Sequence, residues 1–209
     1  MSALRVRFIE EMKLKGLSEN TIEAYVRSVK FLSAYFKKSP AALTDEELRQ
    51  YFLYLLEKRK LSAKSYNVHR ASIHSFYAAI TPERKLPYFK RIRPAFVLPE
   101  VFSASEVERF LNAIESLKYK TIFSLIYSAG LRAGECIRLK AEDIDSERMV
   151  IRIRQSKGKK DRNTILSHHA LSLLREYYKA YQPQHWLFEG FPKTKPLHIR
   201  SIQKVFRRA

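Results

Sequence analysis

The sequence predicts a mainly α-helical protein with a small β-hairpin or sheet (an α+β fold), and three observations carry this prediction. Apolar residues recur at helical spacing in both halves of the chain. One stretch, MVIRIR at 149–154, alternates apolar and basic side chains as a half-buried strand does. Four of the eight prolines fall within residues 81–102, which therefore cannot form one continuous helix. We accordingly divide the chain into residues 1–80, a Pro-rich basic linker at 81–102, and residues 103–209.

Residues 1–80 are expected to form four amphipathic helices packed as a bundle. The first covers residues 2–14, and Ser18 can cap the second. Thr44 and Glu47 form a capping box that opens the third, and the fourth begins near Ser62. The side chains expected to face the core are Leu4, Phe8, Met12, Ile22, Tyr25, Val26, Val29, Leu32, Phe36, Leu48, Tyr51, Phe52, Leu55, Leu56, Tyr66, Ile73, Phe76, Tyr77 and Ile80.

Residues 103–209 are expected to mix helices with the hairpin. Ser103 and Glu106 form a second capping box, and Gly130 interrupts the helical pattern. The expected elements are helices at 103–117, 119–129, 132–140, 167–181 and from about 199 to 209, and strands at 149–154 and 163–167 joined by the turn SKGKKDR. We expect the apolar stripe of the last helix, formed by Ile202, Val205 and Phe206, to lack a cover, because no residues follow that could supply one.

Charge indicates the class of partner. Forty Lys and Arg against twenty-one Asp and Glu give a formal net charge of +19. A folded chain with this excess favours a polyanionic partner, nucleic acid above all. The alternative is a solvated basic surface kept for solubility, although acidic residues serve solubility better than basic ones.

Several classes of function find no support in the motifs. Cys136 is the only cysteine, which excludes a disulfide framework and a cysteine-based zinc site and suits a reducing, cytoplasmic location. The six histidines lack metal-ligand spacing, and neither a phosphate-binding P-loop nor a G-x-S-x-G elbow occurs. No apolar run approaches the roughly 20 residues of a membrane span, and the N-terminus does not have the pattern of a signal peptide. We therefore expect no metal, no small-molecule cofactor and no membrane association.

Two basic residues are the candidates for chemistry. Arg132 follows the break at Gly130, where a guanidinium beside free helix N–H groups can bind one phosphate. Its alternative role is a surface salt bridge with Glu135, three residues on. Lys157 lies in the predicted hairpin turn, where it can enter a groove or donate a proton, or simply be solvated.

In this order and spacing, the motifs resemble the tyrosine recombinase (phage integrase) family. LSENTIEAYVRSVKFLSAYF and NVHRASIHSFY are similar to its N-terminal, SAM-like core-binding domain of four helices. AGLRAGECIRLKAEDID is similar to its first arginine box, and SKGKKDRNTILS to its lysine-bearing β-hairpin. The resemblance implies that Arg132 and Lys157 are catalytic, with Glu135 supporting Arg132, and that residues 103–209 form part of an integrase-type catalytic domain.

The sequence also departs from the family. The family requires a His-x-x-Arg box, a further His or Trp, and a nucleophilic tyrosine, but no histidine here is followed at plus three by arginine. RSIQKVFRRA resembles the helix just before that box. Tyr177, Tyr178 and Tyr181 lie too early and are interpreted as a helix face that packs on the core. We expect a chain truncated before the nucleophile, inactive in the covalent step of DNA recombination and integration.

The resemblance further implies double-stranded DNA as partner, together with full-length recombinase protomers, and we expect the isolated chain to be a monomer. The candidate DNA contacts are Arg27, Lys30, Lys64, Asn67, Arg70, His74, Lys159, Lys160 and Arg162. Three hypotheses stay open at this point. The chain is a recombinase fragment, or a stand-alone DNA-binding module that occupies recombination sites without catalysis, or a basic RNA-associated protein with an accidental likeness.

Overall fold

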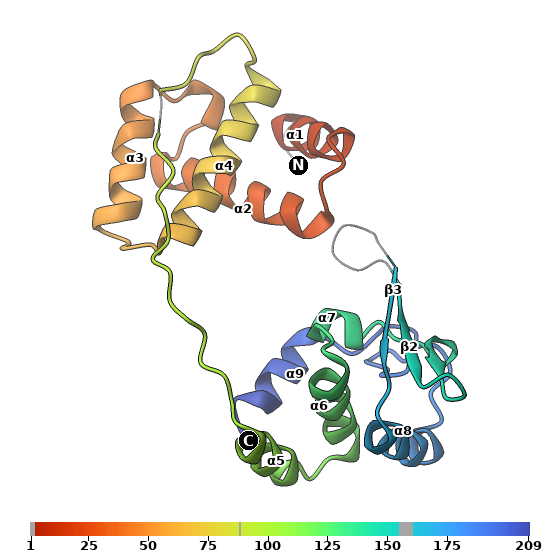
Figure 1. Ribbon diagram of the computed structural model, residues 1–209. Helices are drawn as coiled ribbons and strands as arrows, with labels where there is room; N and C mark the ends of the chain where they lie inside the picture. The colour runs from red at the N-terminus through yellow and green to blue at the C-terminus, as the bar shows by residue number, and fades with distance from the viewer. Residues whose placement is uncertain (1–2, 88, 155–160) are drawn as a thin grey trace. The chain divides into compact units, whose positions relative to one another are not determined.

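The computed structural model describes residues 3–87, 89–154 and 161–209 (Figure 1). Helices dominate, and the strands of the described residues form one antiparallel sheet, so the predicted fold class is confirmed. The first compact unit ends at Leu98 and the second begins at Pro99. Each unit has its own hydrophobic core. Within the described residues, no helix combines the length and the hydropathy needed to span a membrane.

The first unit contains four α-helices and a short 3₁₀ turn, at Ala3–Leu14 (α1), Glu19–Phe36 (α2), Pro40–Ala42 (η1), Asp45–Glu57 (α3) and Ala63–Ile80 (α4). The expected caps are present. The Ser18 side chain accepts from the Thr21 N–H, and Thr44 and Glu47 cap each other reciprocally. Most of the predicted core is buried, and the ring of Phe8 on α1 meets Phe76 on α4 edge to face.

The described residues of the segment 81–98 form no helix or strand, but some of them pack on the helical unit. Leu86, Phe89 and Ile92 pack against the core of the first unit, and the ring of Phe89 lies 4.2 Å from that of Phe52, centroid to centroid. Apolar side chains thus fix part of the expected linker to the helices that precede it. From Arg93 to Phe102 every side chain is exposed.

The second unit contains the helices Ala104–Ala113 (α5), Leu117–Ala129 (α6), Ala133–Cys136 (α7), His168–Tyr181 (α8) and Ile199–Phe206 (α9), with a 3₁₀ turn at Ala141–Asp143 (η2). Its strands are Ile144–Asp145 (β1), Val150–Ile153 (β2) and Arg162–Ile165 (β3), in the order β1-β2-β3. Ile151 and Ile153 of β2 point into the core, and the Thr164 hydroxyl of β3 donates to the carbonyl of Ala129 over 2.8 Å, which ties the sheet to α6.

Two expectations for the second unit are wrong, and a third is wrong in part. The helix predicted at 103–117 ends at Ala113, because Ile114 is extended and Leu117 belongs to α6. The helix predicted at 132–140 is the single turn α7, followed by irregular chain and η2. The stripe of α9, expected to lack a cover, is covered in part from upstream, while the side chain of Phe206 stays 47% exposed. Ile202 is buried, and the ring of Phe206 packs on Phe110 and Phe123.

Candidate functional site

Arg132 lies at the start of helix α7, two residues after the glycine that ends α6. Gly130 ends α6 in the left-handed conformation (φ +59°), which glycine adopts without a Cβ clash. The chain then extends through Leu131, and Arg132 is the N-cap of α7. The backbone N–H of Arg132 donates to Oε2 of Glu135 over 2.8 Å. The break and the cap together fix the direction in which residue 132 leaves the fold.

The carboxylate of Glu135 accepts hydrogen bonds from two arginine side chains of this site. Its side chain is only 4% exposed, and a buried carboxylate requires charged or hydrogen-bonding partners. Nη1 of Arg132 donates to Oε1 over 2.7 Å, and Nη2 of Arg162 on β3 donates to Oε2 over 2.9 Å. The Arg132 side chain is nevertheless 62% exposed. The salt bridge weighed from the sequence therefore exists, and it orients a guanidinium that solvent can still reach.

A second buried carboxylate repeats this arrangement nearby. Asp143 is 3% exposed and accepts from the Lys140 backbone N–H over 2.9 Å and from Nε of Arg154 over 2.7 Å. The Asp143 charge raises the pKa of Arg154. Arg154 comes directly after β2, just as Arg162 opens β3. Sequence reasoning placed Asp143 in the arginine box but missed its pairing with Arg154, because nothing local pairs residues 11 positions apart.

Comparison with known sequences decides the family. The sequence model of the "Phage integrase family" matches residues 100–209, and that of the "Phage integrase, N-terminal SAM-like domain" matches residues 4–86. The chain belongs to the phage integrase family. The arginine box and the hairpin lie within the residues that the first of these models matches. The helices of the first unit lie within the residues that the SAM-like model matches.

Individual relatives agree with the assignment to the phage integrase family. The candidate integrase/recombinase y4qK of Sinorhizobium fredii is 37% identical over the whole of this chain and 68% of its own. A tyrosine recombinase XerA of Pyrococcus horikoshii is 29% identical over 83% of this chain and 59% of its own. This integrase-family chain therefore spans about two thirds of the curated relatives that it matches.

Solved structures show the same fold. A lambda integrase dimer bound to a core site covers 100% of this chain and 76% of its own with a TM-score of 0.74 at 16% identity. A XerH recombinase bound to its difH substrate covers 93% of this chain and 64% of its own with a TM-score of 0.68 at 20% identity. At sequence identities of 16% and 20%, this structural similarity is evidence for a shared fold and for nothing beyond the fold.

The remaining hairpin candidates lie outside the described residues. Lys157, proposed from the resemblance as catalytic, and Lys159 and Lys160, proposed as DNA contacts, belong to residues 155–160. Their roles in this integrase-family chain stay predictions. Arg154 and Arg162, on either side of that segment, are described, and both are ion-paired to buried carboxylates.

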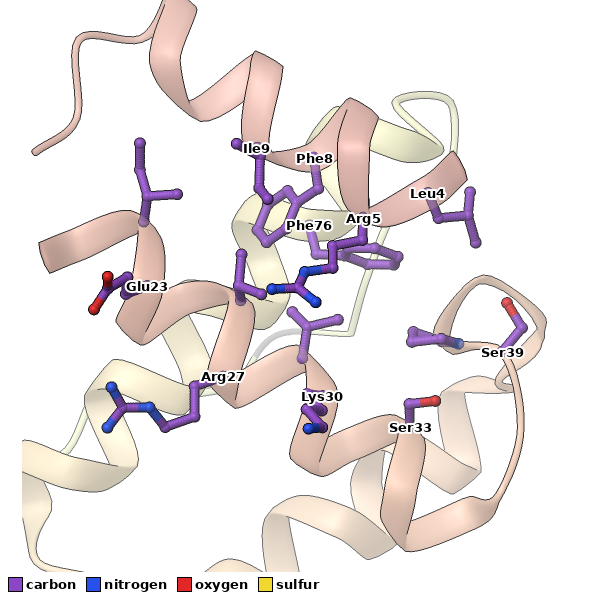
Figure 2. A pocket seen from close by; sticks show the side chains of 14 residues that line it. Leu4, Arg5, Phe8, Ile9, Glu23, Arg27, Lys30, Ser33, Ser39 and Phe76 are labelled. Atoms are coloured by element: carbon purple, nitrogen blue, oxygen red, sulfur yellow. The ribbon is translucent and has the colours of Figure 1, made fainter. Parts of the chain in front are cut away.

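In the helical unit of this integrase-family chain, the candidates Arg27, Lys30 and Lys64 are exposed. Arg27 and Lys30 line a groove of about 750 Å³ between α1 and α2 (Figure 2). Arg5 of α1, a residue that sequence reasoning did not select, also lines it, and Phe8, Ile22, Val29 and Phe76 are among its apolar lining residues. The cations of α1 and α2 therefore belong to one surface.

The other three candidates on α4 hold the chain's own linker. The Asn67 side chain donates to the Ile92 carbonyl over 2.7 Å and accepts from the Ile92 N–H over 3.1 Å. Nε of Arg70 donates to the carbonyl of Phe89, and the ring of His74 lies 6.2 Å from that of Phe89. Their role as DNA contacts stays a prediction, and the structure gives them a second one, docking residues 89–92.

Two histidines of α4, His69 and His74, have a lowered pKa, chiefly because burial disfavours their charged form. The positive charge of Arg59 lowers the pKa of His69 further, and that of Arg70 lowers the pKa of His74. Among the described residues, Nδ1 of His69 and Nε2 of His74 have no hydrogen-bond partner. A histidine whose pKa is lower in the folded state stabilises the fold above its unfolded pKa, near 6.5, and this stability is lost as the pH falls.

Acidification from pH 7.5 to 5 is therefore expected to destabilise the helical unit. Urea unfolding followed by circular dichroism measures this, and Trp186, the sole tryptophan, reports the second unit separately. His74→Gln should weaken the pH dependence, whereas His169→Gln, at an exposed residue of α8, should leave it unchanged. An identical pH dependence in the wild type and in His74→Gln would contradict the assignment to His74.

The tyrosines of α8 do not form one packed face. Tyr177 is buried, stacks on Tyr181 with ring centroids 4.7 Å apart, and has its pKa raised by burial. Tyr178 and Tyr181 are half-exposed, so the interpretation as a core-facing helix face holds for Tyr177 alone. A buried phenol with a raised pKa is a poor nucleophile.

Cys136 follows Glu135 and is completely buried beneath the arginine box. Its Sγ lies 3.9 Å from the carbonyl oxygen of Ile122 on α6. Burial raises the pKa of the thiol, so the reactive thiolate is strongly disfavoured while α7 is folded. Cys136 is therefore a packing residue of the site.

Proposed function

We propose that this chain binds double-stranded DNA as part of a tyrosine recombinase for site-specific recombination and integration, with Arg132 at the scissile phosphate. One observation carries the proposal. The Arg132 guanidinium is exposed, yet the buried Glu135 carboxylate and the N-cap of α7 orient it. A preoriented guanidinium fork matches the geometry of phosphate oxygens and can bind two of them at once. Family membership and the net charge of +19 support the same partner.

The proposed chemistry conserves the energy of the phosphodiester bond. A tyrosine oxygen attacks phosphorus, the bond to the 5′ oxygen breaks, and a 3′-phosphotyrosine and a 5′-hydroxyl form. Negative charge grows on the non-bridging oxygens, where the Arg132 guanidinium stabilises it. Lys157 gives its proton to the leaving 5′ oxygen as general acid. The reverse attack by a 5′-hydroxyl rejoins the strand.

The 209 residues themselves contain no His-x-x-Arg motif. Tyr177 is buried, and Tyr178 and Tyr181 precede the region where the family's nucleophile is expected. We therefore propose that this chain supplies DNA binding and the Arg132 half of the phosphate site, and that it does not form the covalent link.

Incubation of the purified chain with nicked duplex DNA is expected to give no protein–DNA band on a denaturing gel. The reason is that water would have to replace the absent nucleophile. An intact family member serves as the positive control on its own site. A denaturant-resistant band formed by the 209-residue chain would contradict this part of the proposal.

DNA binding is expected to weaken steeply with salt, with a log–log slope of about −0.9 for each phosphate neutralised. Arg27→Ala should reduce the slope by about 0.9, because one phosphate contact is lost. Arg49→Ala removes the same charge from α3, at an exposed arginine paired with Glu46, and should leave the slope unchanged. Fluorescence anisotropy on a labelled duplex measures both. A flat salt response, or tighter binding to single-stranded RNA, would contradict DNA as the partner.

A second candidate function, occupation of recombination sites without catalysis, requires DNA binding alone, which the net charge of +19 favours. In that role the chain competes with full-length recombinase protomers for DNA. Adding it to the reaction of an intact relative on that relative's site tests this, because a competitor lowers the recombinant yield in proportion to site occupancy. An unchanged yield at saturating occupancy would exclude this role.

A further inference from the structure

Two buried carboxylates tie both legs of the β2–β3 hairpin to the segment that carries Arg132. Glu135 pairs with Arg162, the first residue of β3, over 2.9 Å. Asp143 pairs with Arg154, which directly follows β2, over 2.7 Å. Because both carboxylates are almost fully buried, solvent screens these ion pairs less than it screens surface pairs. The hairpin is therefore fixed to the arginine box just before and just after residues 155–160.

The anchor at Glu135 is shared with Arg132. Oε1 accepts from Nη1 of Arg132, while Oε2 accepts from the Arg132 backbone N–H and from Nη2 of Arg162. Removal of Arg162 would take a charged donor from a carboxylate that cannot be hydrated in place. The carboxylate would then turn toward other donors, and the geometry of its contacts with Arg132 would change.

We propose that Arg162 is a positioning residue, which acts through Glu135 to hold the Arg132 guanidinium in the orientation that binds a DNA phosphate. The inference rests on the proposed function, because it takes Arg132 as the phosphate-binding group. It replaces the expectation from the family resemblance, in which Arg162 contacts DNA directly. The Arg162 side chain is 37% exposed and has its Nη2 on Glu135, as this positioning role requires.

A double-mutant cycle on the 209-residue chain tests the proposal. Duplex affinity is measured by fluorescence anisotropy over a range of salt concentrations for Arg132→Ala, Arg162→Ala and the double variant. Each single variant should bind about tenfold more weakly, the scale of one charged hydrogen bond. The double variant should bind no more weakly than Arg132→Ala, and the salt slope should fall by about 0.9 in all three.

Two matched controls distinguish the positioning of Arg132 from two other effects, a weaker attachment of β3 to the fold and the loss of one positive charge. Thr164→Val removes the hydrogen bond between β3 and Ala129 and leaves Glu135 untouched. Arg152→Ala removes one charge from the exposed face of β2. Both should keep the wild-type salt slope and bind within about twofold of wild type. Should Arg162→Ala fail to fold by circular dichroism, Arg162→Met takes its place in the cycle, since methionine keeps most of the side-chain packing and still removes the donor to Glu135.

The outcomes are distinguishable. Additive losses, with the slope of the double variant lowered by about 1.8, would make Arg162 an independent phosphate contact and overturn the proposal. Wild-type binding by Arg162→Ala, with weakened binding by Arg132→Ala, would overturn the proposal and leave the proposed function intact. Wild-type binding by Arg132→Ala would contradict the phosphate site itself, and the positioning role with it.

Discussion

Replacement of Glu135 with alanine is expected to lower the free energy of unfolding of the second unit by about 3 kcal/mol. The change removes two charged hydrogen bonds, from Arg132 and Arg162, and the N-cap contact to the Arg132 backbone N–H. Both guanidiniums are partly exposed and can be rehydrated, which limits the loss. Urea unfolding followed by Trp186 fluorescence measures the effect.

Two further variants define the origin of that loss. Glu135→Gln keeps a carbonyl acceptor for the N-cap and should recover part of the stability, so the difference from alanine measures the cap. Glu147→Ala removes an exposed carboxylate of the same unit and should change the free energy of unfolding by less than about 0.5 kcal/mol. If Glu135→Ala costs no more than Glu147→Ala, the buried carboxylate does not stabilise the arginine box.

Phe188→Ala is expected to destabilise the second unit by about 3–5 kcal/mol. The side chain is 0% exposed and packs on the ring of Tyr177 with centroids 5.2 Å apart. Its removal leaves a cavity that neighbours held by backbone hydrogen bonds cannot easily fill. The Phe188 carbonyl accepts from the Leu197 N–H, and the Leu187 N–H donates to the carbonyl of Leu139, within the arginine box.

Phe191→Ala is the matched control for this cavity. Phe191 lies three residues further along the same irregular segment and is 99% exposed, so its loss should change the free energy of unfolding by less than about 0.5 kcal/mol. Trp186 fluorescence in urea follows both variants. Similar unfolding midpoints for the two variants would show that the segment around Phe188 does not support the core.

Local signals predicted the helix starts of both units well. Ser18, Thr44 and Ser103 cap helices as expected, because a cap is formed within three or four residues of sequence. The expectation of a helix at 132–140 failed for a non-local reason. Cys136 and Leu139, three positions apart, are apolar at helical spacing, but the Leu139 carbonyl accepts from the Leu187 N–H, 48 positions away. Tertiary pairing outweighed local periodicity there.

Only the contacts between residues close in sequence could be predicted for the site. Arg132 and Glu135 are three residues apart, and their pairing follows from that spacing. The partners of the hairpin were hidden, because Arg162 reaches Glu135 across 27 positions. The family resemblance suggested DNA as the partner of Arg162, and of Asn67 and Arg70, whose side chains bond to the backbone of the linker. A sequence shows which side chains are charged, whereas folding determines which charges are already paired.

The buried thiol of Cys136 makes the arginine box observable without any introduced label. A disulfide reagent that yields a coloured product can react only when α7 detaches from α6, because the sulfur has no access to solvent in the fold. The reaction rate of the native chain therefore measures how often this segment opens. If DNA holds Arg132 in place, saturation with duplex slows modification of the neighbouring sulfur, and Glu135→Ala accelerates it.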